Sequence, residues 1–454
     1  MIAQPISQSS VSSATVPNFD APNFEVFQAV HRQVYRRVLD NGIILLITEN
    51  PAADIVSARM LMQGGQRAEA IGKAGVAHLV SAVMTKGTAT RSSFEIAEQV
   101  EAIGASLGTD SSADHFQVTV KTVSADFHEI FALAGEILRS PSFPEAEIEL
   151  ERKLTLQGIR SQQEQPLSVA MDKLRQALYG DHPYADSGLG TLESVAQLNR
   201  DDLQTYHQTV FRPDNLIISI AGRITVAEAN AVVEKVFGDW AKPAQPMPPL
   251  ELPPIVHNPQ TQLTPQDTAQ SIVIVGYLAP AIAPSSSLSD TTPSDYAALK
   301  LLNTYLSGGL SSRLFIELRE KRGLAYEVSA FYPMRLDISF FVGYIGTAPN
   351  NTATALEGLR DEIHRLTEVL LTEEELQVAK DKFLGQYALS KQTNAQLAQT
   401  FAWYEMLGLG LEYDDRLQND IRNLTAETLR ITAKRTFGQP YLSILGPESV
   451  LNSL

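Results

Sequence analysis

The sequence predicts an α+β protein made of two similar domains in tandem. At 454 residues it is longer than one hydrophobic core usually serves. Related segments recur at an offset of 228 residues, with a proline-rich stretch between the two copies. Long helical patterns separate short strand-like runs irregularly. This order favours a mixed or antiparallel sheet with helices on one face over a doubly wound parallel sheet.

Two pairs of segments establish the repeat. "FPEAEIELERKLTLQGIRSQQEQ", from Phe143, and "LTEEELQVAKDKFLGQYALSKQT", from Leu371, both begin with the acidic first turn that is typical of helix N-termini. Residues 198–222 and 424–446 each read as an amphipathic helix, a turn and an alternating strand. Two copies at so long a period do not make a solenoid.

Strand-like runs occur in both halves. They are "GIILLITEN", "SARMLMQGG" and "FQVTVKTV" in the first half, and "QSIVIVGYL", "VSAFYP" and "ISFFVGYIGT" in the second.

The domain boundary is expected where prolines gather. Eight of the 24 prolines lie between Ala241 and Pro265. Proline fixes φ and removes a backbone donor, so this stretch should run extended, outside helices and sheet ladders. We predict a flexible leader over 1–23, a first domain over 24–240, a proline-rich linker over 241–265 and a second domain over 266–454.

Composition excludes several classes of function. The net charge of −16 disfavours nucleic acid and anionic membranes as partners and suits basic or amphipathic peptides. Without cysteine there is no disulfide, no thiolate zinc site and no thiol catalysis. No apolar run reaches the roughly 18 residues that span a bilayer. No Lys or Arg precedes Arg32, so a signal or transit peptide is not expected, and we predict a cytoplasmic protein.

One segment in the first half carries a specific resemblance. "GVAHLVSAVMTKGT", from Gly75 to Thr88, predicts a helix that leads into a Lys-Gly-Thr turn, with His78 on a small, apolar surface. It resembles the inverted zinc motif His-x-x-Glu-His of the M16 peptidase family (pitrilysin, insulinase, mitochondrial processing peptidase), in its M16B-type form. In that motif both histidines bind zinc, and the glutamate activates the zinc-bound water.

The resemblance runs from about residue 30 to the C-terminus. It implies two domains of the LuxS/metallopeptidase-like fold, which together form half of a clamshell.

The motif is degenerate in this chain. By the resemblance, His78 keeps the first ligand position, Ser81 replaces the general base and Ala82 replaces the second histidine. The third ligand position falls on Gly158, in "ERKLTLQGI". One imidazole does not hold zinc, which takes three or four protein ligands. We therefore expect no metal or cofactor in this chain and no peptidase activity from it alone. On the residues alone, His78 is a helix histidine that hydrogen-bonds locally or lines a cavity.

The second half carries the densest motif, "SGGLSSRLFIELREKRGLAYEVSAFY", from Ser307 to Tyr332. It predicts a helix that is capped by Ser311 or Ser312 and ends at Gly323 in a left-handed cap. Its apolar stripe is Leu314, Phe315 and Leu318, and its last turn carries Arg319 and Arg322. In this local account Arg319 compensates the helix dipole and Tyr326 is a strand aromatic.

The family resemblance gives two of these residues a sharper role. In M16 enzymes the half without zinc contributes an arginine and a tyrosine seven residues apart, and "LREKRGLAY" matches with Arg319 and Tyr326. The resemblance implies that they hold the substrate backbone and stabilise the developing oxyanion. Gly308 and Gly309 resemble the family's glycine-rich loop, which is implicated in substrate handling.

These observations support one leading hypothesis and two others. The first is a non-catalytic subunit that pairs with a zinc-bearing M16 paralogue to cleave peptides. The zinc is then expected in the partner. When isolated, such a subunit could form a homodimer. The second is a non-enzymatic peptide-binding or structural core-type protein of the same fold, which has no need of an oxyanion donor. The third, an active peptidase with relocated ligands, is disfavoured because the eight histidines include no further pair at metal-binding spacing.

Overall fold

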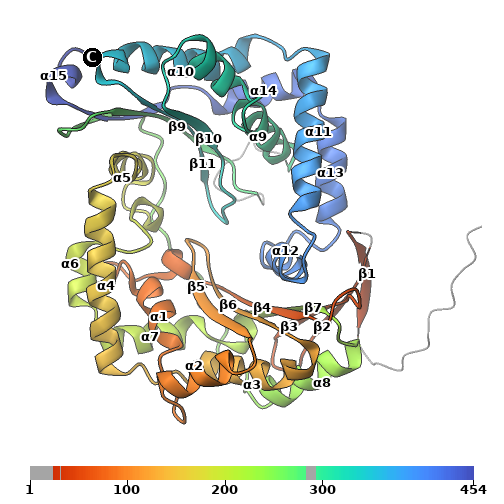
Figure 1. Ribbon diagram of the computed structural model, residues 1–454. Helices are drawn as coiled ribbons and strands as arrows, with labels where there is room; N and C mark the ends of the chain where they lie inside the picture. The colour runs from red at the N-terminus through yellow and green to blue at the C-terminus, as the bar shows by residue number, and fades with distance from the viewer. Residues whose placement is uncertain (1–23, 31, 283–292) are drawn as a thin grey trace, which may run out of the picture.

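Two β-sheets, each with its own set of helices, make up the chain (Figure 1). The computed structural model describes residues 24–30, 32–282 and 293–454, so the predicted leader over 1–23 lies outside the described residues. The two-domain α+β architecture with mixed sheets confirms the predicted fold class.

The first sheet has seven strands in the described part of the chain, in the order β1-β2-β3-β7-β4-β6-β5. Neighbours are antiparallel except for β3 and β7, which are parallel. In chain order the strands are β1 Glu25–Ala29, β2 Arg32–Val38, β3 Ile44–Glu49, β4 Val56–Gln63, β5 Ser106–Ser111, β6 His115–Thr122 and β7 Leu216–Gly222.

The second sheet repeats this topology. Its strand order is β10-β11-β9-β12-β8, with only β12 and β8 parallel. The first sheet, read from its β5 edge, has the corresponding order β5-β6-β4-β7-β3 with the same pairing senses. The strands are β8 Thr261–Pro265, β9 Ser271–Ala279, β10 Glu327–Phe331, β11 Ser339–Thr347 and β12 Tyr441–Gly446. The 228-residue repeat in sequence is thus a repeat in topology.

One expectation about the proline-rich stretch is wrong. Its last residues form β8 and pair in parallel with β12, although we expected no ladder there. Because β8 is an edge strand, only one side of it needs donors and acceptors, and its proline, Pro265, stands at its end.

The helices lie between and beside these strands. They are α1 Val76–Met84, α2 Ser93–Glu101, α3 Phe127–Arg139, α4 Glu145–Gln163, α5 Pro166–Tyr179, α6 Leu192–Gln197, α7 Arg200–Val210, α8 Val226–Phe237, α9 Pro293–Leu306, α10 Thr352–Glu368, α11 Glu373–Leu389, α12 Asn394–Met406, α13 Tyr413–Asn423, α14 Ala426–Thr436 and α15 Glu448–Leu451. Short 3₁₀ turns are η1 Gly65–Ala68, η2 Ser124–Asp126, η3 Pro183–Ala185, η4 Pro213–Asn215 and η6 Pro349–Asn351, and η5 Phe315–Lys321 is a π-helix. Among the described helices none has the length and apolarity to cross a bilayer.

Each sheet is buried on both faces. Side chains alternate along β3, so Leu45 and Ile47 join the core formed with the first half's own helices. Leu46 faces the other way, into a separate core that contains Leu397 and Phe401 of α12. Burial on both faces explains why the central strands are continuous apolar runs rather than alternating ones.

The two halves exchange a helix. α12 of the second half covers β4 and β7 of the first sheet, and α5 of the first half covers β9 and β12 of the second. α12 begins 228 residues after α5, so the exchanged helices are repeat equivalents. On β9, Gly276 allows the close approach, because a Cβ there would lie 2.9 Å from Leu174 Cδ1 of α5.

Polar contacts also join the halves. Asp114, which is buried, accepts a hydrogen bond from the Tyr184 hydroxyl, and Arg335 Nη1 of the second half lies 3.8 Å from its carboxylate. Arg36 Nη2 forms an ion pair with Glu405 Oε1 of α12 at 2.9 Å. The exchanged helices and these pairs hold the two halves against each other (Figure 1).

Candidate functional site

The helix α1 presents His78 on its less buried side. Val76, Leu79 and Val80 pack into the first core, while His78 is half-buried. Gly75 provides no side-chain cap; instead, Glu69 Oε1 accepts the backbone N–H groups of Gly75 and Ala77, each at 3.0 Å.

The imidazole of His78 stays neutral near pH 7. Burial lowers the pKa of His78, and the carboxylates of Glu151 and Asp110 offset part of that shift. A neutral imidazole is the form that binds metals, but it needs further ligands.

The positions that correspond to the lost zinc chemistry carry no ligand atoms. Ser81 Oγ donates to the carbonyl of His78 at 2.7 Å, and Ala82 is a methyl group. Gly158 lies on α4, which packs against α1; a Cβ there would meet Leu189 Cδ1 at an ordinary 3.5 Å, so a side chain has room. Within residues 24–30, 32–282 and 293–454, no three His, Cys, Asp or Glu side chains are arranged to hold a metal. The residues present therefore do not fit a zinc ion.

The neighbouring carboxylate is engaged elsewhere. Glu151 Oε1, about two turns before Gly158 on the same face of α4, forms an ion pair with Lys86 Nζ at 3.0 Å. Lys86 belongs to the Lys-Gly-Thr turn that follows α1. This pair ties α4 to the end of α1 and keeps the frame of the two helices without a metal.

The second half places Arg319 and Tyr326 on one continuous segment. Arg319 belongs to η5 and is exposed, with its guanidinium 5.0 Å from the centre of the Phe315 ring. Tyr326 directly precedes β10, its backbone N–H donates to Gly346 O, and its side chain is 64% exposed. η5 and β10 are in contact.

The C-terminal end of this helix has the cap that the sequence predicts, but the winding of the helix differs from the prediction. Gly323 adopts φ +61°, and its N–H donates to Arg319 O, as a left-handed cap requires. The segment was expected to be an ordinary helix, but Phe315–Lys321 winds as a π-helix. Such wide turns are uncommon and occur often at functional sites.

The two arginines of this helix have different environments. Arg322 Nη2 lies 3.3 Å from Glu362 Oε1 of α10. Arg319 takes part in no ion pair within the described part of the chain. Arg322 is therefore engaged by a buried carboxylate of its own chain, whereas the guanidinium of Arg319 is left exposed.

The Gly308–Gly309 loop lies between α9 and η5. A Cβ on Gly308 would lie 2.7 Å from Lys382 Cε, so the lysine side chain of α11 lies directly on this glycine. Gly309 has φ +119°, which favours glycine. Leu310, the next residue, is 77% exposed. The loop thus presents an apolar tip beside a cation.

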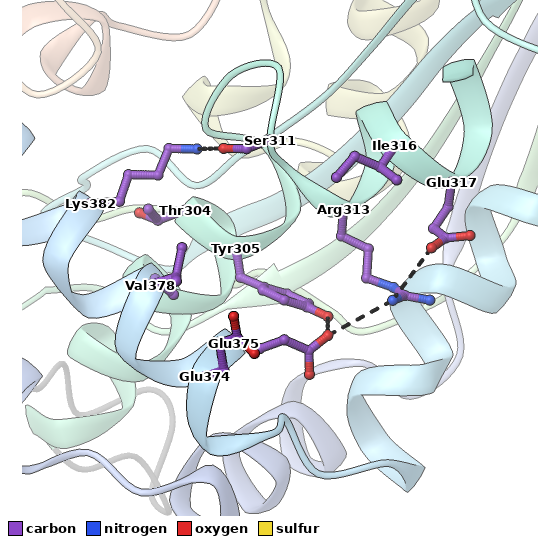
Figure 2. A pocket seen from close by; sticks show the side chains of 11 residues that line it. Thr304, Tyr305, Ser311, Arg313, Ile316, Glu317, Glu374, Glu375, Val378 and Lys382 are labelled. Carbon is purple, nitrogen blue, oxygen red and sulfur yellow. Dashed lines mark hydrogen bonds and ion pairs between the residues drawn. The ribbon is translucent and has the colours of Figure 1, made fainter. Parts of the chain in front are cut away.

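A pocket of about 240 Å³ opens beside this loop, between α9, η5 and α11. Figure 2 shows Lys382 at one end, 3.5 Å from Ser311 Oγ, and Glu375 at the other, where it accepts a hydrogen bond from Tyr305. Aliphatic side chains such as Val378 line its wall. The pocket offers apolar surface with Lys382 at one end and, at the other, Arg313 paired with Glu317 and Glu375.

A larger cavity, about 580 Å³, lies between the two halves. The first half contributes Arg175 and Ser111, which ends β5, and the second contributes Ser329 and Phe331 of β10. The edge strands of both sheets therefore border a shared space, and one of them is the strand that follows Tyr326.

The structure thus groups the predicted residues into two sites. His78, Ser81, Ala82 and Gly158 lie on the touching helices α1 and α4, and the two glycines, Arg319 and Tyr326 lie around η5. Sequence reasoning missed Glu362. Its signal was a glutamate inside the apolar stripe of α10, between the buried Leu359 and Leu366.

Comparisons with known proteins find matches to both halves of the chain. The family described as "Insulinase (Peptidase family M16)" matches residues 44–192, and the "Peptidase M16 inactive domain" matches residues 197–383. An uncharacterized zinc protease of Mycobacterium leprae is 27% identical, over 91% of this chain and 92% of its own. An uncharacterized zinc protease of Bacillus subtilis is 26% identical, over 92% of this chain and all of its own.

Solved structures share the fold. A peptidase M16 inactive domain from Pseudomonas fluorescens superposes with a TM-score of 0.83 at 23% identity, covering 91% of this chain and 98% of that one. A protease from Helicobacter pylori gives a TM-score of 0.84 at 22% identity, covering 92% and 100%.

Proposed function

Because the chain belongs to peptidase family M16 but lacks a zinc ligand set, we propose that it is the non-catalytic subunit of a two-chain peptidase. The zinc resides in a paralogous partner that keeps the His-x-x-Glu-His motif. This chain supplies Arg319 and Tyr326 to bind the peptide backbone and stabilise the oxyanion. One observation carries the proposal: of the motif's three zinc ligands the first half keeps only His78, while the second half presents an exposed Arg319 that is unpaired within the described residues.

The role that we propose for this chain in catalysis is electrostatic stabilisation. Peptide hydrolysis at a zinc site develops negative charge on the scissile oxygen, and a guanidinium and a phenol hydroxyl are donors suited to it. Neither side chain is buried by its own chain, so both are free to face a second molecule. The Gly308–Gly309 loop and the pocket beside it supply apolar surface for substrate side chains.

Reconstitution with the partner tests the proposal. The chain would be co-expressed with an intact zinc-bearing paralogue of the same organism, and co-purification, zinc content and cleavage of an unstructured basic peptide would be measured. We expect a complex with one zinc per pair, and cleavage that needs both chains. Stoichiometric zinc and peptidase activity in this chain alone would overturn the proposal. A stable complex whose activity equals that of the paralogue alone would favour a structural protein instead.

A further inference from the structure

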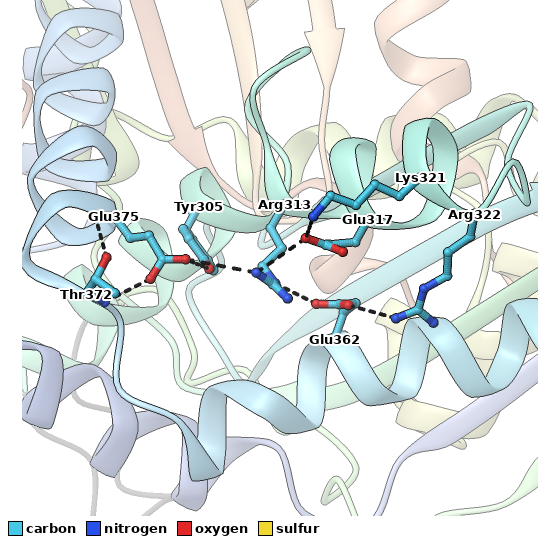
Figure 3. Close-up of polar contacts among 8 residues, drawn as sticks. All are labelled: Tyr305, Arg313, Glu317, Lys321, Arg322, Glu362, Thr372 and Glu375. Atoms are coloured by element: carbon cyan, nitrogen blue, oxygen red, sulfur yellow. Dashed lines mark hydrogen bonds and ion pairs between the residues drawn. The ribbon is translucent and has the colours of Figure 1, made fainter.

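η5 is tied to α10 by a single buried carboxylate. Glu362 is 3% exposed. Arg313 Nε, just before η5, donates to Glu362 Oε2 at 2.6 Å, and Arg322 Nη2, just after η5, lies 3.3 Å from Oε1 (Figure 3). Each carboxylate oxygen therefore fixes one end of η5. A charged hydrogen bond at each end defines direction as well as distance.

A glycine completes the contact. Gly358 lies one turn before Glu362 on the same face of α10. A Cβ on Gly358 would lie 2.9 Å from Leu318 Cδ2 and 3.1 Å from Arg322 Nη1. We call Gly358 and Glu362 the α10 seat. The missing side chain lets η5 approach, and the carboxylate holds it there.

The seat determines where Arg319 points. Leu318 is fully buried toward α10, and the next residue of a helix projects from a different side. Arg319 is accordingly exposed, and it lies over Phe315 of its own helix rather than against another element. Nothing else described in the structure ties its guanidinium.

The same seat determines the path to Tyr326. Leu324 N donates to Leu318 O at 2.9 Å, which closes the end of η5 onto the buried residue. Two residues later Tyr326 N binds Gly346 O and enters the sheet. A shift of η5 on α10 would therefore move both exposed side chains together.

We propose that Glu362 is a positioning residue, which acts through Arg313 and Arg322 to hold Arg319 and Tyr326 in one fixed orientation toward the partner's active site. Only the statement that Arg319 and Tyr326 face a partner's active site rests on the proposed function. The competing account is an ion cluster that contributes to the stability of the whole second half and has no local effect.

Hydrogen exchange separates the two accounts without any partner. In Glu362→Gln, amides of residues 315–324 should exchange about tenfold faster or more, while those of β9 and β11 stay unchanged. Glu357→Gln, an exposed glutamate of the same helix, is the matched control and should change nothing. Arg322→Gln removes only the more exposed tie and gives a second test should Glu362→Gln fold poorly. Faster exchange throughout the second half, or none at 315–324, overturns the proposal.

Kinetics in the reconstituted complex test the link to the site. Glu362→Gln should lower kcat about 10- to 100-fold with a smaller change in KM, as for loss of a group that orients a catalytic side chain. Added to the Arg319→Ala/Tyr326→Phe background it should cost less than about twofold, because it acts through those residues. Losses that multiply in that background overturn the positioning role. If the background itself keeps full activity, the proposed function fails, and hydrogen exchange alone then decides whether Glu362 fixes η5.

Discussion

Arg319→Ala removes a side chain that contributes little to folding, so its effect on activity reports directly on its chemical role. The guanidinium is exposed and contacts Phe315 of its own helix, a cation–π contact worth about 0.5–1 kcal/mol at an exposed site. A helix-end charge adds at most about 1 kcal/mol. The sum of these two contributions is too small to unfold a domain of this size. Loss of an oxyanion donor, by contrast, costs about 10²- to 10³-fold in kcat, or roughly 2.7–4 kcal/mol.

The assay is peptide cleavage by the complex with the zinc-bearing paralogue, with the thermal unfolding midpoint and partner binding measured in parallel. We expect kcat to fall at least about 100-fold, with folding and pairing intact. The control must be chosen from the structure. Arg322, three residues on, is held by buried Glu362 and is not a neutral choice. Lys321 is a suitable control, because its side chain is 61% exposed and, among the described residues, it pairs only with Glu317 on the surface of the same helix. Equal losses in Arg319→Ala and Lys321→Ala would refute the catalytic role.

Three further outcomes follow from the structure. Burial raises the pKa of Glu69 to about 8, above its value of 4.5 in an unfolded chain, so the stability that Glu69 contributes is fully present below about pH 4.5 and is lost as the pH rises from 4.5 to 8; Glu69→Gln should flatten that part of the pH profile of the unfolding midpoint, and an unchanged profile would contradict the burial argument. Ala82→His with Gly158→Glu, beside His78, should bind about one zinc per chain by elemental analysis, because α1 and α4 keep their contact; no zinc above the wild-type level would show that the frame is lost. Phe401→Ala should destabilise the protein by about 3–5 kcal/mol, and in hydrogen exchange it should expose β4 and β7 of the first half; protection lost only in the second half would argue against the helix exchange.

Much of the fold could be predicted because its central strands are apolar runs in the sequence. The run that contains Leu45, Leu46 and Ile47 is continuous, and such runs form strands buried on both faces. What covers the second face could not be predicted. The sequence of α5 shows an apolar stripe, but a stripe does not say which sheet it meets. β8 was missed because the prolines before it, its own Pro265 and its polar residues argue against a ladder, and its pairing depends on the distant β12.

The candidate site likewise contains residues that the sequence could predict and residues that it could not. Arg319 and Tyr326 lie in a contiguous motif, so their spacing was visible in the sequence. Glu362 reaches the same helix from about 40 residues further along the chain, and only the packing of α10 against η5 brings it there. The π-helical winding was also invisible, because its residues are ordinary helix formers.

The exchanged helices make the chain resemble a domain-swapped dimer joined into one polypeptide. In such an arrangement each half completes the other's core, so a half expressed alone would leave one sheet face uncovered and prone to aggregate. Moving the halves apart would require two separate apolar interfaces, at α5 and at α12, to open together. We therefore expect the two halves to move together as one body. Under the proposed function, an opening wide enough to admit a peptide would form between this chain and its partner, and the contact between the two chains would act as the hinge that controls entry.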